Sequence, residues 1–75
     1  MRFAFNYVCH VGAVMPDGDM TTMVFGANEV IEPINMRCLT LEARTHQDFE
    51  LKDGTVILDV PLAAIRLEPE HADCV

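Results

Sequence analysis

The chain has 75 residues, with 12 acidic and 5 basic side chains and a formal net charge of −7. This charge disfavours nucleic-acid binding, because phosphate backbones are bound mainly through lysine and arginine, and it suits a basic protein partner. The hydrophobic fraction of 51% is high for so short a chain, and a small domain buries only a small core. The surplus apolar side chains indicate burial against a partner, most simply in a homo-oligomer.

The cysteines and the lengths of the apolar runs indicate the cellular compartment of the protein. Three cysteines without a CxxC motif cannot form a complete disulfide framework, and reduced thiols are typical of cytoplasmic proteins. No apolar run approaches the roughly 20 residues that span a bilayer. We therefore expect a cytoplasmic protein with no membrane partner. Nucleic acid would become a ligand only if four arginines converged on one patch: Arg2, Arg37, Arg44 and Arg66.

The first predicted element is a strand over residues 2–11. Apolar and polar side chains alternate along it, which is typical of a strand with one buried face. The predicted core face comprises Phe3, Phe5, Tyr7, Cys9 and Val11.

A hairpin follows this strand. The segment Met15-Pro16-Asp17-Gly18 predicts a type I turn, with proline in its second position and glycine in its fourth. Residues 20–25 are the predicted return strand. If this hairpin lies at a sheet edge, its unpaired backbone groups would favour strand-to-strand dimerisation, helped by the apolar side chains of Met20, Met23 and Val24.

The middle of the chain has weaker signals. Gly26 and Pro33 disfavour a helix between them, so we expect a loop, or a single turn capped by Asn28. Residues 35–43 predict another strand. Its apolar pattern changes phase near Cys38, where a β-bulge would reconcile the two halves.

A second hairpin is predicted over residues 48–60. Asp53-Gly54 fits a two-residue type I′ turn. This turn would pair Leu51 with Val56 and Phe49 with Leu58, which places these four side chains on the core face. Ile57 would then lie on the polar face, opposite Glu50.

The chain closes with short elements. Residues 61–64 fit one 3₁₀ turn, residues 65–67 a last short strand, and residues 69–75 an acidic, flexible tail. We therefore expect one domain over residues 1–68, followed by the tail. Five or six short strands with at most one helical turn predict an all-β fold, either a small antiparallel barrel or a strongly bent sheet.

The segment GTVILDVPLAAIRLEP, residues 54–69, resembles the end of SH3-like and Sm-like barrels. In both, a strand is followed by one 3₁₀ turn and a short closing strand. The resemblance covers about a quarter of the chain and implies a fold in outline, without a function.

The densest acidic zone comprises Glu42, Asp48, Glu50, Asp53 and Asp59. A solvated sheet face is the simplest explanation. However, Asp48 and Asp59 are predicted to lie across the hairpin from each other, where like charges cost stability, and this conflict favours a function. The candidate contact surface is Asp48, Glu50, Ile57 and Asp59.

No motif predicts a metal site, a cofactor or catalysis. The residue types that zinc prefers are present, namely Cys9, His10, Cys38, His46, His71 and Cys74. Cys9 and His10 would point to opposite faces of their strand, however. His71 and Cys74 are the only pair with suggestive local spacing, and Cys38 with His46 is the conceivable nucleophile pair. Asp17 and Asp19 supply too few oxygens for calcium.

We therefore expect a non-catalytic, acidic protein-interaction module, such as an adaptor, an inhibitor or an accessory subunit, that self-associates. Its size and charge would suit a protein encoded by a phage or a mobile element. The alternative is a small-barrel protein that binds nucleic acid or a small ligand through its arginines and through stacking on phenylalanine or tyrosine.

Overall fold

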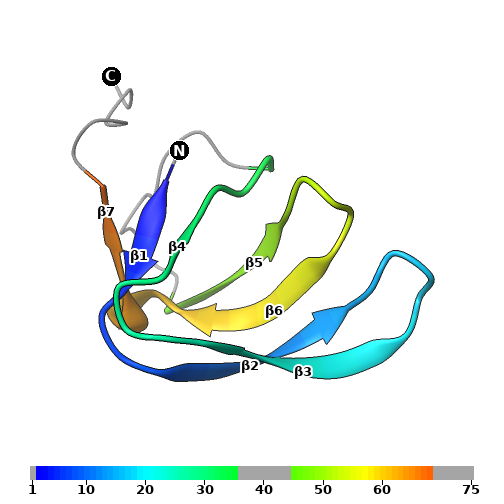
Figure 1. Cartoon of the computed structure of the whole chain (residues 1–75), viewed down its shortest axis with the longest axis horizontal. Helices are drawn as coiled ribbons and strands as arrows, with labels where there is room; N and C mark the ends of the chain where they lie inside the picture. The colour runs from blue at the N-terminus through cyan, green and yellow to red at the C-terminus, as the bar shows by residue number, and fades with distance from the viewer. Residues whose placement is uncertain (1, 36–44, 69–75) are drawn as a thin grey trace.

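The computed structural model describes residues 2–35 and 45–68, and these residues form two antiparallel sheets. Figure 1 shows the smaller sheet at one end of the longer, curved one. The three-stranded sheet has the order β4-β1-β7, and the four-stranded sheet has the order β3-β2-β6-β5. The strands are β1 (Phe3–Phe5), β2 (Cys9–Val14), β3 (Met20–Phe25), β4 (Val30–Ile31), β5 (His46–Glu50), β6 (Val56–Pro61) and β7 (Ile65–Leu67).

Aromatic side chains join the two sheets in one core. Phe5 of the smaller sheet stacks on Phe25 of the larger one, with ring centroids 4.8 Å apart, and Phe3 contacts Phe49 at 4.7 Å. All four rings are buried. Large aromatic surfaces bury much apolar area in a short chain, so these contacts hold the sheets against each other.

The predicted first strand is divided in two. β1 ends at Phe5 and β2 begins at Cys9, so the intervening residues carry the chain from one sheet to the other. The Asn6 amide donates a hydrogen bond to the carbonyl of Ala64 (2.8 Å), which holds this corner. The corner breaks the alternation, and Tyr7 is 51% exposed. The prediction that Tyr7 belongs to the core is wrong, whereas the predictions for Phe3, Phe5, Cys9 and Val11 are confirmed.

The first hairpin has the predicted turn and return strand. The Gly18 amide donates to the Met15 carbonyl (2.9 Å), which closes the type I turn. Gly18 has a φ of 91°, a left-handed conformation that glycine adopts without a steric penalty. The return strand, β3, covers residues 20–25 as expected.

The second hairpin has a different register from the predicted one. The Gly54 amide donates to the Leu51 carbonyl (3.1 Å), and the Leu51 amide donates to the Thr55 carbonyl (2.8 Å). The loop therefore has one more residue than the predicted type I′ turn. Among the turn residues only Gly54 has a positive φ, which is the pattern of a type I turn followed by a glycine bulge.

This extra loop residue reverses the faces of β6. Phe49 now pairs with Ile57, and Glu50 pairs with Val56. Because side chains alternate along a strand, a shift of one residue exchanges the two faces. Ile57 is fully buried, so its predicted place on the polar face is wrong. Val56 and Leu58, predicted for the core, lie on the opposite face and are partly exposed.

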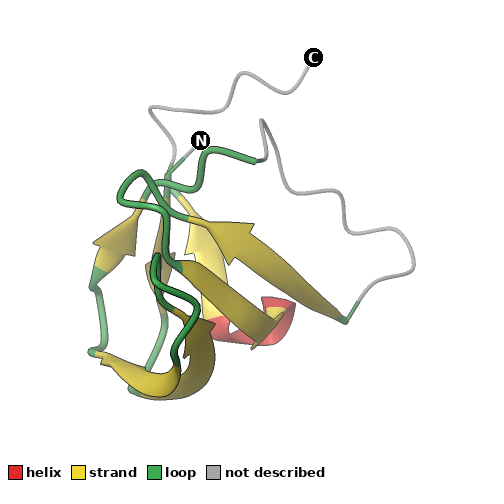
Figure 2. Cartoon of the chain, turned by 90° about the vertical axis from the view of Figure 1, so that its right-hand side faces the viewer, coloured by secondary structure: helices red, strands yellow, loops and turns green. Residues whose placement is uncertain are grey.

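The end of the described chain agrees with the prediction. The 3₁₀ turn η1 (Leu62–Ala64), red in Figure 2, leads directly into β7. The expected loop after residue 25 contains one short strand, β4. The all-β antiparallel prediction is confirmed, but the two sheets are not closed into a barrel, so that part is unconfirmed. The strand predicted at 35–43 lies almost wholly outside the described residues, and the tail at 69–75 lies fully outside them.

Candidate interaction surface

The side of the four-stranded sheet that faces away from the core carries a row of apolar side chains. We call it the outer face. Across the strands, Met20 pairs with Val14, and Val14 pairs with Val56. A second row joins Thr22, Gly12 and Leu58. Val24 of β3 pairs with His10 in a third row. The apolar strip comprises Val24 and the large apolar side chains of the first two rows: Val14, Met20, Val56 and Leu58.

The apolar strip is open to solvent where it reaches β3. Met20 is 75% exposed and Val24 is 56% exposed. Gly12 lies in the middle of the strip, and no atom lies within 4 Å of the position that a side-chain carbon would occupy there. Contiguous exposed apolar side chains on a small protein mark a contact surface more often than isolated ones do.

Carboxylates lie at the β5 end of both rows. Glu50 pairs with Val56 and so continues the first row. The register between β5 and β6 then shifts, so that Leu58 and Asp59 together lie opposite Asp48. This arrangement is a β-bulge, in which two residues face one. The outer face therefore changes from apolar at β3 to acidic at β5.

The bulge explains how the fold accommodates the carboxylates of Asp48 and Asp59 across from each other. They do lie across the hairpin from each other, but the Asp59 amide donates a hydrogen bond to the carboxylate Oδ1 of Asp48 (2.7 Å). Asp59 has a φ of 55°, a conformation that aspartate tolerates better than most residues. The carboxylate of Asp48 thus stabilises the bulge, which gives this residue a structural role.

Three of the four predicted contact residues are therefore exposed on the outer side of the sheet: Asp48, Glu50 and Asp59. Ile57 is excluded from this surface because it is part of the core. Asp48 and Asp59 also line an open depression of about 380 Å³ together with His46 and Gln47. The apolar half of the surface, on Val14, Val56 and Leu58, was not predicted. The alternation along residues 9–14 places Val14 on that face, but Val56 and Leu58 depended on the turn register.

The two edges of this sheet are different. Along β5, the Ile34 amide donates to the Glu50 carbonyl (2.8 Å), and the Glu50 amide donates to Oδ1 of Asn35 (3.0 Å). Nδ2 of Asn35 also donates to the Asp48 carbonyl (3.3 Å). The backbone of this edge is thus partly covered. No described segment pairs with the outer edge of β3.

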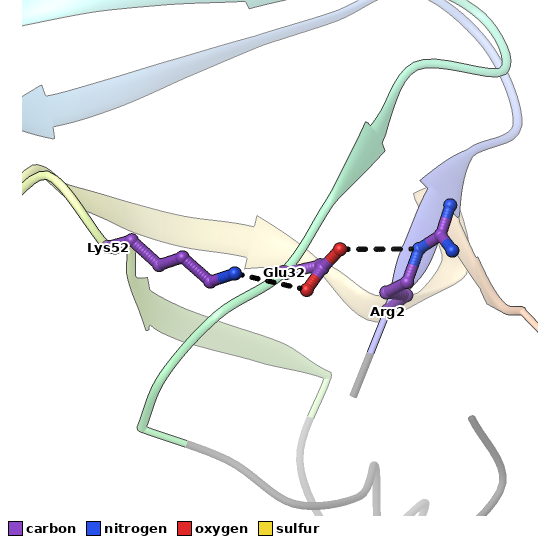
Figure 3. A network of polar contacts seen from close by, with 3 residues as sticks. All are labelled: Arg2, Glu32 and Lys52. Atoms are coloured by element: carbon purple, nitrogen blue, oxygen red, sulfur yellow. Dashed lines mark hydrogen bonds and ion pairs between the residues drawn. The ribbon is translucent and has the colours of Figure 1, made fainter.

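The described basic side chains are held by other groups. Glu32 lies between Arg2 and Lys52, with N to O distances of 3.5 and 3.4 Å (Figure 3). Arg66 donates to the side-chain oxygens of Asn6 (3.1 Å) and Asn28 (2.8 Å). Glu32 and Lys52 also line an open groove of about 370 Å³ between β4 and the second hairpin. Arg37 and Arg44 lie outside the described residues.

Within residues 2–35 and 45–68, no three metal-ligating side chains gather at one point. Cys9 is buried and His10 is exposed, so these two do point to opposite faces. The His46 ring lies 2.8 Å from the Thr45 hydroxyl. Cys38, His71 and Cys74 lie outside the described residues, so the zinc and nucleophile pairs that include them stay untested. No helix in the described part of the chain is long and apolar enough to cross a membrane.

Comparison with known proteins gave no relative: no protein-family model, no curated protein and no solved structure matches this chain.

Proposed function

We propose that the protein is a non-catalytic, self-associating interaction module that binds other protein surfaces through the outer face of its four-stranded sheet. The observation that carries this proposal is the apolar strip, which crosses three strands and ends at carboxylates on β5. A cytoplasmic setting, inferred from the cysteines, is part of the same proposal.

The partner that fits this face has an apolar strip beside basic side chains. Apolar contact in the centre of an interface supplies most of the affinity, and charges at the rim supply specificity and speed of association. The described residues include nine carboxylate side chains and three basic ones. Glu32 engages Arg2 and Lys52, and Asn6 and Asn28 engage Arg66. The outer-face carboxylates of Asp48 and Glu50 therefore remain for an external basic group.

The alternative function, binding of nucleic acid or a small ligand, has less support. Stacking on bases needs exposed aromatic rings, but Phe3, Phe5, Phe25 and Phe49 are buried. Tyr7 is the one exposed aromatic ring among the described residues. A single ring without adjacent unpaired cations is a weak platform for a nucleic-acid strand.

Affinity capture from the native host tests the proposal. Wild-type protein is immobilised beside the single variants Leu58→Lys and Glu50→Lys, and captured proteins are identified and then tested in purified form. We expect Leu58→Lys to reduce binding of the purified partner by about tenfold or more, because it places a charge in the apolar strip. Glu50→Lys should reduce it less and mainly at low salt.

Ala63→Lys is the matched control for Leu58→Lys, because it adds the same single charge on η1, outside the four-stranded sheet. Circular dichroism of each variant checks that it folds. Equal binding by the wild type and both outer-face variants would remove this face from the proposal. Tight binding of RNA or single-stranded DNA that weakens steeply with salt would support the alternative.

A further inference from the structure

We propose that β3 pairs antiparallel with β3 of a second copy of this chain, across a two-fold axis at Thr22. This inference rests on the proposed function, since it names a second copy as one occupant of the surface that includes β3. The dimer would join the two four-stranded sheets into one continuous sheet.

Backbone amides and carbonyls along the outer edge of β3 point in the direction that such pairing needs. The Met15 amide donates to the Asp19 carbonyl (2.8 Å), and this bond sets the phase of the ladder between β2 and β3. In an antiparallel ladder, hydrogen-bonded pairs alternate with pairs that make no such bond. The amides and carbonyls of Met20, Thr22 and Val24 therefore point away from β2. No bond of these groups to another described segment is present.

One register uses all three of these residues. With Thr22 opposite Thr22 of the second copy, Met20 lies opposite Val24 on both sides of the axis. The Thr22 pair and the two Met20–Val24 pairs can each exchange two backbone hydrogen bonds, for about six in total. An axis moved by one residue in either direction would leave Met20 or Val24 outside the paired segment.

The side chains suit the same register. Met20 and Val24 are the most exposed members of the apolar strip, and this pairing brings each against the other in the second copy. Apolar cross-strand pairs stabilise sheets, and threonine pairs do so as well. The apolar strip would thereby continue across the axis from one subunit to the other, and Met20 and Val24 of each copy would cover part of each other's side chains.

The charges also permit this pairing. β3 contains no charged residue, so the net charge of −7 does not act directly across the two strands. Asp19, the nearest carboxylate, would lie opposite Phe25. Natural proteins protect exposed edges with charges, prolines or bulges, and the six-residue β3 has none of these devices and an unbroken register with β2. The absence of protection is expected for an edge that a second copy covers.

Amide hydrogen exchange measured by NMR at several protein concentrations tests the register directly. We expect the amides of Met20, Thr22 and Val24 to become protected about tenfold or more as the concentration rises through the dimer dissociation constant. The amides of Thr21, Met23 and Phe25 face β2 and serve as internal controls, since they should be protected at every concentration.

A charge exchange at the axis gives a second test. Thr22→Lys and Thr22→Glu each place like charges opposite each other in a homodimer, and each should weaken self-association by about tenfold. A mixture of the two variants should form a heterodimer about as tight as the wild-type dimer. Sedimentation velocity measures both. Ala63→Lys mixed with Ala63→Glu is the control pair, because residue 63 lies on η1, outside β3.

Three results would overturn the inference: a wild-type protein that stays monomeric at about 1 mM, a dimer that leaves the amides of Met20, Thr22 and Val24 unprotected, or a charge-exchanged mixture no tighter than its components. In each case a partner whose binding is lost on Leu58→Lys would still support binding of other proteins through the outer face, although a monomeric wild type would also reject the self-association in the proposed function. A dimer with the expected pattern, together with no partner that is sensitive to Leu58→Lys, would sustain this inference and reject the outer-face proposal.

Discussion

The two edge strands of the four-stranded sheet, β3 and β5, differ in how far their exposed backbone is protected from pairing with another chain. β5 carries two carboxylates on Asp48 and Glu50, lies opposite a bulge and is partly covered by Ile34 and Asn35. β3 is uncharged, regular and uncovered by the described residues. Both strands expose backbone groups that another chain could pair with. Among the described residues, the contrast shows that β5 is protected against such pairing and β3 is not.

Replacing Thr22 by proline should give the largest effect and would remove the contrast between the edges. The Thr22 amide points away from β2, so proline there keeps the hairpin ladder and is tolerated at an edge. It removes both central bonds of the dimer, and we expect the dissociation constant to rise about a hundredfold. Sedimentation equilibrium measures this change.

Met23→Pro is the comparison for this variant, because the Met23 amide faces β2 across the pair with Val11. Proline at that position breaks the monomer's own ladder and should lower the free energy of unfolding by about 3 kcal/mol. If Thr22→Pro destabilised the monomer as much as Met23→Pro, the assignment of outward-facing groups on β3 would be wrong.

Asp48→Ala should have a smaller effect and tests how the β5 edge is built. The variant removes the acceptor of the Asp59 amide, a charge-assisted bond of 2.7 Å. Because the site is exposed, we expect a loss of about 1 kcal/mol in the free energy of unfolding, measured by urea denaturation. Asp48→Asn keeps an acceptor and should lose less. Glu50→Ala, which removes an exposed carboxylate outside the bulge, should change stability little, and an equal loss there would contradict the structural role of Asp48.

The two hairpins show how far the sequence could be interpreted. Pro16 restricts the second turn position to the φ of a type I turn, and that hairpin was predicted correctly through the end of β3. Lys52 occupies the same position in the second hairpin and imposes no such restriction, so Asp53-Gly54 was equally compatible with a type I′ turn. The difference of one loop residue exchanged the faces of β6 and moved Ile57 into the core.

Other features depended on tertiary contacts that local patterns do not contain. The bulge needs the left-handed Asp59 and the carboxylate of Asp48, which lie 11 residues apart in the chain. The corner at Tyr7 is held by η1, which comes nearly 60 residues later. β3 was predicted as a strand, but its position at the edge follows from the strand order. The acidic half of the outer face could therefore be predicted, and the apolar half on β6 could not.

The smallest effect we predict is the pH dependence of the turn between β5 and β6. The Thr55 amide donates to the carboxylate of Asp53 (2.9 Å), and this bond lowers the pKa of that carboxyl from its usual value. A carboxyl with a lowered pKa in the folded state stabilises it above the unfolded pKa of about 3.9. That contribution disappears as the pH falls through the lower folded value. Acid should therefore destabilise the second hairpin slightly, and Asp53→Asn should remove this part of the pH dependence.

Urea denaturation at about pH 5 and about pH 2.5 compares the wild type with Asp53→Asn. If the wild type lost no more stability on acidification than Asp53→Asn, the Asp53 bond would not couple the turn to pH.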